Sequence, residues 1–245
     1  MLRHKYISLI TLLLLPLFLY WQMPWWTYVL LFLIHAGFTA WGAFDIRLNY
    51  FLPAFSSFKT NENAIALTFD DGPTEFTPLV LDLLAKYDAK ATFFCIGKQI
   101  ALYPEIAKRI VDEGHQIANH TYSHSNQMGF LSKKRLLDEF EQTDVLLEKI
   151  TGGSNRYFRP PFGVTNPHIA KAVKEKNYKV IGWNIRSLDT VIEEEKIYNR
   201  IIDKIDKGGI VLLHDTSQKT VAVLERLLII LKEKKYKSVT IANCI

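Results

Sequence analysis

The sequence predicts an α/β fold: a distorted seven-stranded (β/α) barrel, preceded by an N-terminal transmembrane hairpin of two helices. Three observations indicate this. The N-terminus is nearly free of charge, β-type and helical segments alternate after residue 60, and several β-type runs end in carboxylates or imidazoles. Strand–helix alternation is typical of parallel strands with helices outside. Seven strands fall short of an eightfold barrel, which takes ~250 residues, and an open doubly wound sheet is the alternative.

The N-terminal segment is expected to lie in a membrane. Residues 6–44 contain no Asp, Glu, Lys or Arg. As one straight helix they would be about 58 Å long, against a hydrocarbon core of ~30 Å. Residues 22–24 interrupt the run, and the tryptophans that flank them favour a membrane interface. We therefore expect two transmembrane helices within residues 1–48. One span with an interfacial helix, or a cleaved signal peptide, are the alternatives.

The remaining chain divides into a linker, 49–60, and a folded domain, 61–245. Thr77 and Pro78 form a helix start, an N-cap residue followed by proline at the first helical position. A charged amphipathic helix is expected over 132–150. The β-type runs, which are rich in apolar residues, are expected at 64–70, 91–97, 116–120, 156–160, 179–185, 209–214 and 237–243.

Two adjacent carboxylates, Asp70 and Asp71, end the first of these runs at a Gly-Pro turn. Side chains alternate between faces along a strand, but at a strand end both can reach one cleft. Crowded acids are costly unless a cation or a shared proton offsets their repulsion. The pair therefore suggests a metal ligand and a base, although an ordinary Asp-Gly turn explains it as well when it is taken alone.

His120 and His124 lie four residues apart, a spacing that places two imidazoles on one face of a helical turn. Two ligands of one zinc-like ion have this spacing, as do unrelated surface histidines. Together with one aspartate they would supply three protein ligands and leave a position for water. Catalytic zinc sites have this arrangement, whereas structural sites are closed by four ligands.

Three further segments complete a recognisable set. They are Arg159-Pro160-Pro161-Phe162-Gly163, the stretch from Trp183 to Asp189, and the apolar run that ends in His214-Asp215. In order and spacing the five segments resemble the motifs of the polysaccharide deacetylases, the family built on the NodB homology domain (carbohydrate esterase family 4). The resemblance covers about residues 60–245 and implies the distorted seven-stranded barrel.

The resemblance also implies a metal-dependent hydrolase that removes N-acetyl groups from amino sugars. Asp71, His120 and His124 would bind one divalent ion, with Zn2+ the expected metal. Asp70 would be the general base that takes the proton of the attacking water, and Arg159 would tether Asp70.

The other implied roles concern the leaving group and the substrate. His214 would protonate the departing amine, and Asp189 would pair with His214 and keep it basic. The backbone N–H near Phe162 would help to hold the oxyanion, and Leu212 would line the acetyl pocket.

The sequence departs from the family pattern at two positions. Asp189 is followed by Thr190, where relatives commonly have the tryptophan that walls the acyl pocket, so the acyl preference is open. Arg186 stands where the family often has an acidic or small polar residue. It is either a solvated loop cation or a substrate-binding residue that contacts an anionic glycan.

The expected location is the bacterial cytoplasmic membrane, as a multi-pass protein. A hairpin returns the chain to its starting side, and Arg3, Lys5, Arg47 and Lys59 are compatible with two cytoplasmic ends. A cytoplasmic site would suit a lipid-linked glycan, including one with a formamido sugar from which a deformylase removes the formyl group. An external site would suit peptidoglycan or another polysaccharide. The net charge of +5, from 30 basic and 25 acidic residues, fits an anionic membrane face.

The remaining features receive structural interpretations. Cys95 is expected to be a buried core thiol, and the two cysteines form neither a metal motif nor a case for a disulfide. The sequence has no nucleic-acid motif, Gly-rich phosphate loop or internal repeat, and it indicates no protein partner. A non-catalytic carbohydrate-binding relative is the alternative function. The presence of base, three ligands, arginine and acid together favours the enzyme.

Overall fold

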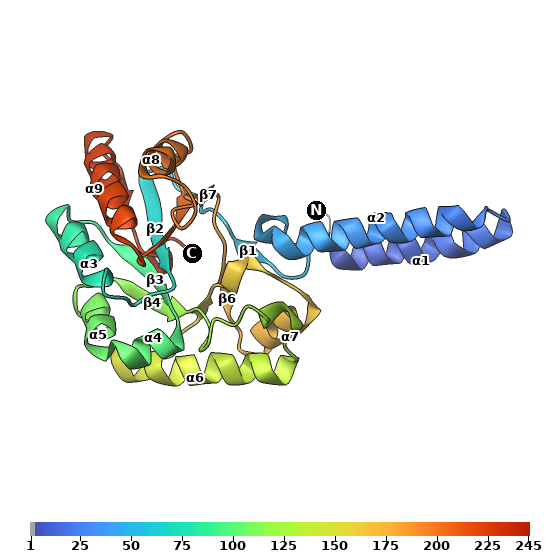
Figure 1. Ribbon diagram of the computed structural model, residues 1–245, viewed down its shortest axis with the longest axis horizontal. Helices are drawn as coiled ribbons and strands as arrows, with labels where there is room; N and C mark the ends of the chain where they lie inside the picture. The colour runs from blue at the N-terminus through green and yellow to red at the C-terminus, as the bar shows by residue number, and fades with distance from the viewer. Residues whose placement is uncertain (1–2) are drawn as a thin grey trace.

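The β-type runs of the domain assemble into one curved sheet in which every pair of strands is parallel. The computed structural model describes residues 3–245. The strand order is β1-β6-β5-β4-β3-β2-β8-β7, and β9 pairs with β2 (Figure 1). The strands are β1 (Ala54–Phe55), β2 (Ala64–Asp70), β3 (Ala91–Cys95), β4 (Gln116–Asn119), β5 (Tyr157–Phe158), β6 (Lys179–Ile181), β7 (Ile185–Arg186), β8 (Gly209–His214) and β9 (Lys237–Ser238).

Helices cover the outside of this sheet, as the alternation in the sequence predicts. Short 3-10 turns occur at Ile46–Leu48 (η1), Met128–Phe130 (η2), Pro161–Gly163 (η3) and Ile241–Asn243 (η4). The domain helices are α3 (Thr77–Lys86), α4 (Gly97–Leu102), α5 (Pro104–Asp112), α6 (Lys133–Thr151), α7 (Pro167–Glu175), α8 (Glu194–Ile202) and α9 (Gln218–Glu233).

Strand β2 is buried on both faces, and its alternation separates core from site. Ile65, Leu67 and Phe69 pack in the large apolar cluster with residues of α3 and α9. The alternate side chains Ala66 and Thr68 face the inside of the curved sheet, and the last residue of that row is Asp70. Two-sided burial is typical of parallel strands. The strand thus carries one carboxylate to the inner face at its C-terminal end.

The run predicted as one strand at 179–185 is broken into β6 and β7. β6 pairs with β1 and β5, whereas β7 pairs with β8. At the break the Gly182 N–H donates to Phe55 O at 2.8 Å, and Asn184 Oδ1 accepts from Ile210 N at 2.8 Å. Residues 182–184 thus connect β6, the second strand from one end of the sheet, to β7 at the other end. The α/β class is confirmed, and the architecture is a parallel-strand half-barrel rather than a ring closed by hydrogen bonds.

The last predicted strand, 237–243, is also shorter than expected. Only Lys237–Ser238 pairs, with Ala64 and Ile65 at the start of β2. From Leu67 onward β3 pairs with β2, so no edge remains for a longer strand. The chain therefore turns into η4. The predicted run at 156–160 is likewise reduced to β5.

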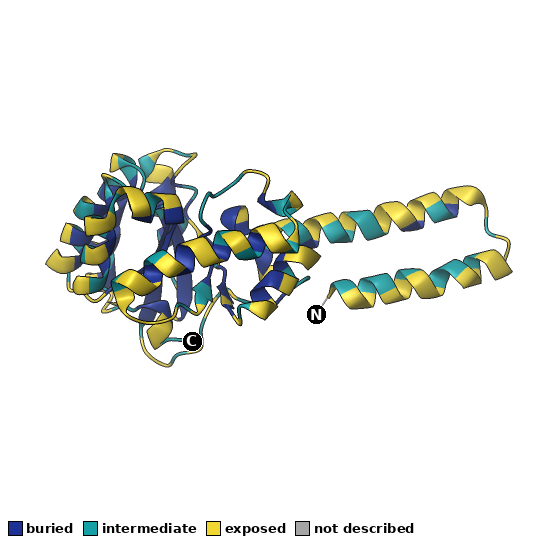
Figure 2. Ribbon diagram, turned by 90° about the horizontal axis from the view of Figure 1, so that it is seen from below, coloured by how far each residue is buried: buried dark blue, intermediate teal, exposed yellow. Residues whose placement is uncertain are grey.

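The N-terminal residues form an antiparallel hairpin of α1 (His4–Tyr20) and α2 (Trp25–Phe44), which projects from the domain (Figure 1). Most of its large apolar side chains are exposed (Figure 2). By length and composition, α2 with its 20 residues could cross a membrane. The apolar helix α1 has 17 residues and contains Pro16. The structure therefore provides one apolar helix of spanning length within a helical hairpin.

The range expected to be a linker, 49–60, is instead an ordered part of the domain. It contains β1, which pairs with β6, and the buried side chains Tyr50 and Leu52. Leu52 belongs to an apolar cluster with Ile46 that also includes residues of α6 and α7. The linker prediction failed because this range finds partners that lie outside it in the sequence: Tyr50 packs against Gly42 of α2, Leu52 joins the cluster with α6 and α7, and β1 pairs with β6. Cys95 is fully buried, as predicted.

Candidate active site

A cavity of about 160 Å³ opens at the carboxyl ends of the parallel strands. The register explains why the polar residues meet there, since Asp70 on β2 lies opposite His214 on β8. Barrel enzymes also place their sites at this end of the strands. The lining residues are Asp70, Asp71, His120, His124, Phe162, Gly163, Trp183, Arg186, Leu188, Thr190, Leu212 and His214. Of the ten predicted site residues, Arg159 and Asp189 lie directly behind this lining.

Asp70 is held by a buried arginine. The Arg159 guanidinium is fully buried and donates to Asp70 Oδ1 at 2.7 Å and to Thr68 Oγ1 at 2.8 Å. Its other nitrogens donate to the carbonyls of Ile181, at 3.1 Å, and Gly182, at 2.9 Å. Burial lowers the pKa of Arg159 and Asp70 raises it, and a guanidinium stays protonated in proteins. Asp70 is therefore fixed in one orientation by a partner that remains charged.

The structure brings Asp71, His120 and His124 together. Asp71 Oδ1 lies 3.4 Å from His120 Nε2 and 3.2 Å from His124 Nε2. One potential ligand atom from each residue lies within 4.8 Å of the other two. Burial raises the pKa of Asp71, but the imidazoles of His120, His124 and His214 outweigh this effect and hold it well below its usual range. Asp71 is thus an anion directed at two imidazoles.

The prediction that the two histidines share a helical turn is wrong. His120 follows β4, and the chain continues as a loop in which Thr121 and His124 have left-handed φ angles of 66° and 49°. Glu139 on α6 holds this loop, because its Oε2 accepts from the backbone N–H groups of Tyr122 and Ser123 at 3.0 and 2.7 Å. The imidazoles therefore converge through loop geometry. Glu139 is a positioning residue that no sequence pattern indicated.

The donor set fits a cation. His120 Nδ1 lies 2.7 Å from Arg159 O, and because a carbonyl only accepts, we assign the proton to Nδ1. His120 Nε2 then directs a lone pair at Asp71 Oδ1, which is buried and has no hydrogen-bond donor among residues 3–245. Burial and the neighbouring His120 lower the pKa of His124, which favours the neutral imidazole that binds metals. Two nitrogens and one carboxylate are a set that binds zinc, and the backbone carbonyl supplies the usual support of a ligating histidine.

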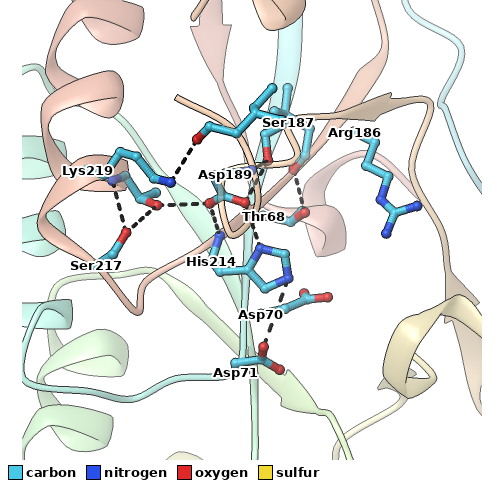
Figure 3. A network of polar contacts seen from close by, with 12 residues as sticks. Thr68, Asp70, Asp71, Arg186, Ser187, Asp189, His214, Ser217 and Lys219 are labelled. Atoms are coloured by element: carbon cyan, nitrogen blue, oxygen red, sulfur yellow. Dashed lines mark hydrogen bonds and ion pairs between the residues drawn. The ribbon is translucent and has the colours of Figure 1, made fainter. Parts of the chain in front are cut away.

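On the opposite side of the cavity, His214 is paired with Asp189 (Figure 3). His214 Nδ1 lies 2.8 Å from Asp189 Oδ1, and the His214 backbone N–H donates to Asp189 Oδ2 at 2.7 Å. Ser187 and Thr220 also donate to this buried carboxylate, at 2.8 and 3.0 Å. Burial alone lowers the pKa of His214, but the hydrogen bond and charge of Asp189, with the charges of Asp70 and Asp71, raise it to about 9. His214 is thus a protonated acid at neutral pH, with Nε2 facing the cavity 4.0 Å from Asp71 Oδ2.

The apolar wall of the cavity includes Trp183 and Leu188, which the sequence did not single out, beside the predicted Leu212. Gly163 is needed in this wall, since a Cβ there would lie 2.6 Å from the Trp183 ring. Thr190 also lines the cavity, at the position where the family pattern predicts an indole. Trp183 therefore gives this wall an aromatic surface, while the short side chain of Thr190 leaves space in the same lining.

Two predicted substrate-binding residues lie at the mouth of the cavity. Phe162 is 53% exposed, and its ring centroid lies 4.8 Å from that of His124. Arg186 is exposed and stands apart from the polar network in Figure 3. An aromatic face and a free-standing guanidinium at the rim are suited to a sugar ring and an anionic group, respectively.

Backbone strain is concentrated around the cavity. Asp71, Phe162 and Leu188 have φ angles of 73°, 59° and 62°, which L-residues seldom adopt. Strained residues cluster at functional sites and persist only where the surroundings impose them. At Asp71 the surroundings include a buried Asp215, whose Oδ2 accepts from Thr77 Oγ1 at 2.5 Å.

Asp215, the last residue of the motif that contains His214, packs under the turn that carries Asp71. A Cβ on Gly72 would lie 2.2 Å from Asp215 Oδ2, so the turn requires glycine. Burial raises the pKa of Asp215 to about 7. The sequence signal was present, since Asp215 directly follows His214, but its partner Thr77 lies 138 residues away.

Comparison with known proteins agrees with the family that the sequence motifs indicate. The family model described as polysaccharide deacetylase matches residues 58–181. The chain belongs to the polysaccharide deacetylase family. A peptidoglycan-N-acetylglucosamine deacetylase of Bacillus cereus is 37% identical over 195 residues, which are 75% of this chain and 88% of that protein. The peptidoglycan-N-acetylmuramic acid deacetylase PdaA of Bacillus subtilis is 33% identical over 199 residues, 78% of this chain and 75% of that protein.

The polysaccharide deacetylase fold occurs in active and inactive proteins. A carbohydrate esterase family 4 pseudoenzyme from Bacillus anthracis has a TM-score of 0.72 at 30% identity, over 78% of this chain and 68% of that chain. A mutant of it with restored enzymatic activity has the same TM-score at 31% identity, over 78% of this chain and 71% of that chain. Fold alone therefore does not distinguish enzyme from pseudoenzyme, and the side chains in the cavity must be considered.

Proposed function

We propose that this chain is a metal-dependent hydrolase that removes N-acetyl groups from amino sugars of a peptidoglycan-type glycan. The observation that carries the proposal is the Asp71 carboxylate, which faces two imidazole nitrogens and has one buried oxygen without a donor. The Bacillus cereus and Bacillus subtilis relatives are named as deacetylases of N-acetylglucosamine and N-acetylmuramic acid residues of peptidoglycan. Base, arginine, acid and its carboxylate partner surround the same cavity.

We assign Asp71, His120 and His124 as the protein ligands of one divalent ion, with Zn2+ favoured by the two nitrogen donors and one oxygen donor. When bound, such an ion supplies Lewis-acid polarisation of the acetyl carbonyl and lowers the pKa of a nearby water. Three protein ligands leave room for water and substrate.

Asp70 is proposed as the general base. Arg159 occupies its Oδ1, so Oδ2 is the oxygen that accepts the proton of the attacking water. Oδ2 lies 3.8 Å from His120 Nε2, which places it beside the proposed ligands. The hydrogen bond from Arg159 fixes the carboxylate, so that this second oxygen keeps its place beside them.

His214 is proposed as the general acid. Asp189 occupies its Nδ1, so the proton on Nε2 is the one available to the sugar nitrogen as the C–N bond breaks. The amine leaves protonated, and acetate remains in the cavity. The backbone N–H of Phe162 is proposed to assist with the negative charge on the carbonyl oxygen.

The rim and wall are proposed to choose the substrate. Leu212, Leu188 and Trp183 offer an apolar surface for the acetyl methyl, and Thr190 widens the space beside them. Arg186 is proposed to contact an anionic group, such as the carboxylate that distinguishes N-acetylmuramic acid from N-acetylglucosamine.

The N-terminal hairpin is proposed to anchor residues 1–48 in the cytoplasmic membrane by two spans, so that the protein is multi-pass. A 20-residue helix is about 30 Å long, the thickness of the hydrocarbon core. The exposed apolar surface of both helices supports this location. The ordered domain, 49–245, then lies on the side from which the chain enters.

Release of acetate from N-acetylglucosamine oligomers and from peptidoglycan tests the proposal. The purified full-length protein should release acetate, lose that activity when a chelator strips the metal, and regain it with zinc. Glu148→Gln on the exposed face of α6 is the matched control and should behave like the wild type. Zinc-loaded protein without activity on any of these glycans would favour the carbohydrate-binding alternative.

A further inference from the structure

The hairpin defines where a membrane surface would meet the domain. Trp21, Trp25 and Trp26 lie at its turn, and Trp41 lies near its base. Trp25 and Trp41 are sixteen residues apart, or about 24 Å along the helix. Tryptophans at both ends of a span are typical of the two interfaces of a bilayer. The near interface therefore lies at the level of Trp41.

The domain is docked firmly against this level of α2. The Thr165 N–H donates to Ala43 O at 2.9 Å, and Thr165 Oγ1 donates to Gly42 O at 3.3 Å. Gly42 is in close contact with the Tyr50 ring, since a Cβ there would lie 2.2 Å from it. Residues next to Thr165 are thus held at the depth where lipid headgroups would lie.

Phe130 is the most notable of these neighbours. Its side chain is 93% exposed, although it ends a turn whose first residue, Met128, is buried in the core. Asn166, next to Thr165, donates from Nδ2 to Gly129 O at 2.7 Å and fixes the turn in place. Figure 1 shows α7 and the adjoining start of α6 at the end of the domain nearest the hairpin. A rigidly held, fully exposed aromatic ring therefore lies on the membrane-proximal end.

Exposed cations accompany Phe130. Lys134 and Arg135 follow it in the first turn of α6, and Lys171 and Lys174 lie on the exposed face of α7. Among the exposed acids of these two helices, Glu175 is paired with Lys133 and Glu141 with Lys176, while Asp138 lies one turn after Lys134 and Arg135, so basic side chains remain in excess. The surface around Phe130 is thus positively charged, which complements anionic headgroups.

The loop that carries Thr165 and the loop that carries Phe130 also build the active site. Gly163 lines the cavity, and Thr165, two residues later, bonds to α2. His124 lines the cavity, and Phe130 follows six residues later in the chain. Two residues span at most about 7 Å, so Gly163 in the cavity wall lies close to Thr165 and to the level of the proposed bilayer surface.

We propose that Phe130, Lys134, Arg135, Lys171 and Lys174 form a second membrane contact that binds the surface of an anionic phospholipid bilayer. Phe130 inserts among the headgroups and the four cations pair with phosphates. This contact holds the mouth of the cavity at headgroup level, so that the glycan it meets is one still attached to the membrane. The inference rests on the proposed anchor and deepens the proposed substrate class.

Fluorescence quenching in vesicles tests this contact with the full-length chain. Phe130→Cys, in a Cys244→Ser background, carries a nitrobenzoxadiazole label; Cys95 is fully buried. The vesicles contain phosphatidylglycerol and phosphatidylethanolamine with brominated acyl chains. Interfacial side chains reach about 5–10 Å into the boundary, so the label at position 130 should be quenched and blue-shifted.

Two further labelled variants provide the matched comparison. Phe32→Cys, halfway along α2 and exposed, reports insertion of the hairpin. Leu102→Cys places the label at an equally apolar, 64% exposed position on α4. Helix α4 packs near Thr143, which lies about 15 Å along α6 from the start of that helix. The label at 32 should be quenched, and the label at 102 should remain solvent-like.

Each outcome decides. Quenching of the labels at 32 and 130 but not of the label at 102 supports the contact. Loss of the quenching at 130 in phosphatidylcholine vesicles supports an anionic membrane surface. Solvent-like emission at 130 with quenching at 32 overturns the contact and leaves the anchor intact. No quenching at 32 overturns both the membrane anchor and the second contact. Equal quenching at 130 and 102 shows unspecific adsorption and overturns the second contact. Unchanged quenching at 130 in phosphatidylcholine overturns the anionic assignment. Acetate release from soluble oligomers is measured separately, so a failed deacetylase proposal would be recognised on its own.

Discussion

On one side of the cavity both oxygens of Asp189 accept hydrogen bonds, whereas on the other side Asp71 Oδ1 is buried and accepts none. Asp70 resembles Asp189, because Arg159 fixes it from behind. All three are aspartates at or just after strand ends. They differ in whether the chain itself supplies their partners.

This difference separates preorganised groups from a group that requires a ligand. Leaving a buried polar group unpaired costs about 1–3 kcal/mol, and more for a charge. The protein avoids that cost at Asp70 and Asp189 with its own donors. At Asp71 it places two imidazole nitrogens instead, a set that becomes satisfied when a cation binds between them. Each variant below removes one of these groups, its partner or a neighbouring side chain of the cavity.

The largest expected effect is on turnover in His214→Ala. Removal of a general acid slows amide hydrolysis by about 10²–10⁴-fold. An activated aryl acetate has a leaving group that departs without protonation, so its hydrolysis should change little. Steady-state rates on the two substrates check this. An equal loss on amide and ester would contradict the role of His214 as acid.

Arg159→Met should remove the partner of a buried carboxylate and lower the free energy of unfolding by about 3–5 kcal/mol. The control is Arg156→Met, three residues earlier and exposed, which should stay within about 0.5 kcal/mol of the wild type. Urea denaturation of both variants gives the comparison. Similar stabilities would mean that Asp70 does not depend on Arg159.

Asp189→Asn should move the alkaline limb of the pH–rate profile to lower pH. Asp189, with smaller contributions from the charges of Asp70 and Asp71, raises the pKa of His214 to about 9, so the acid is available below that pH and is lost as pH rises through it. Without this anion the pKa returns toward the ordinary histidine value of about 6.5. A bound cation lowers the pKa in both proteins and leaves the sign of the shift unchanged. An unmoved limb would show that another group is the acid.

Thr190→Trp should have the smallest effect, on the choice of acyl group. The indole fills space that Thr190 leaves beside Leu188 and Leu212, so propionyl turnover should fall relative to acetyl by about tenfold. Formyl turnover should be unaffected. Rates on formyl, acetyl and propionyl glucosamine measure this. A wild type that already accepts acetyl alone would contradict the wider pocket.

The sequence was sufficient for those features that depend on strand ends. Asp70 and His214 each close an apolar run, and in a parallel sheet the carboxyl ends of all strands lie at the same edge. Features that depend on distant partners were not predictable. The loop that aims His120 and His124 is held by Glu139 on α6, and the break between β6 and β7 depends on bonds from Gly182 and Asn184 to other strands. The left-handed backbone of Leu188 gives no local signal either, since leucine rarely adopts it.

The most direct test of the central contrast is the metal content of Asp70→Asn and Asp71→Asn, measured on both purified proteins after dialysis against buffered zinc. Asp70→Asn should retain one zinc per chain and lose turnover, because the base is gone while the ligands remain. Asp71→Asn should lose the zinc, because a neutral amide replaces the carboxylate that faces both imidazoles. Equal zinc in the two variants, whether both full or both empty, would contradict the division of roles between these adjacent aspartates.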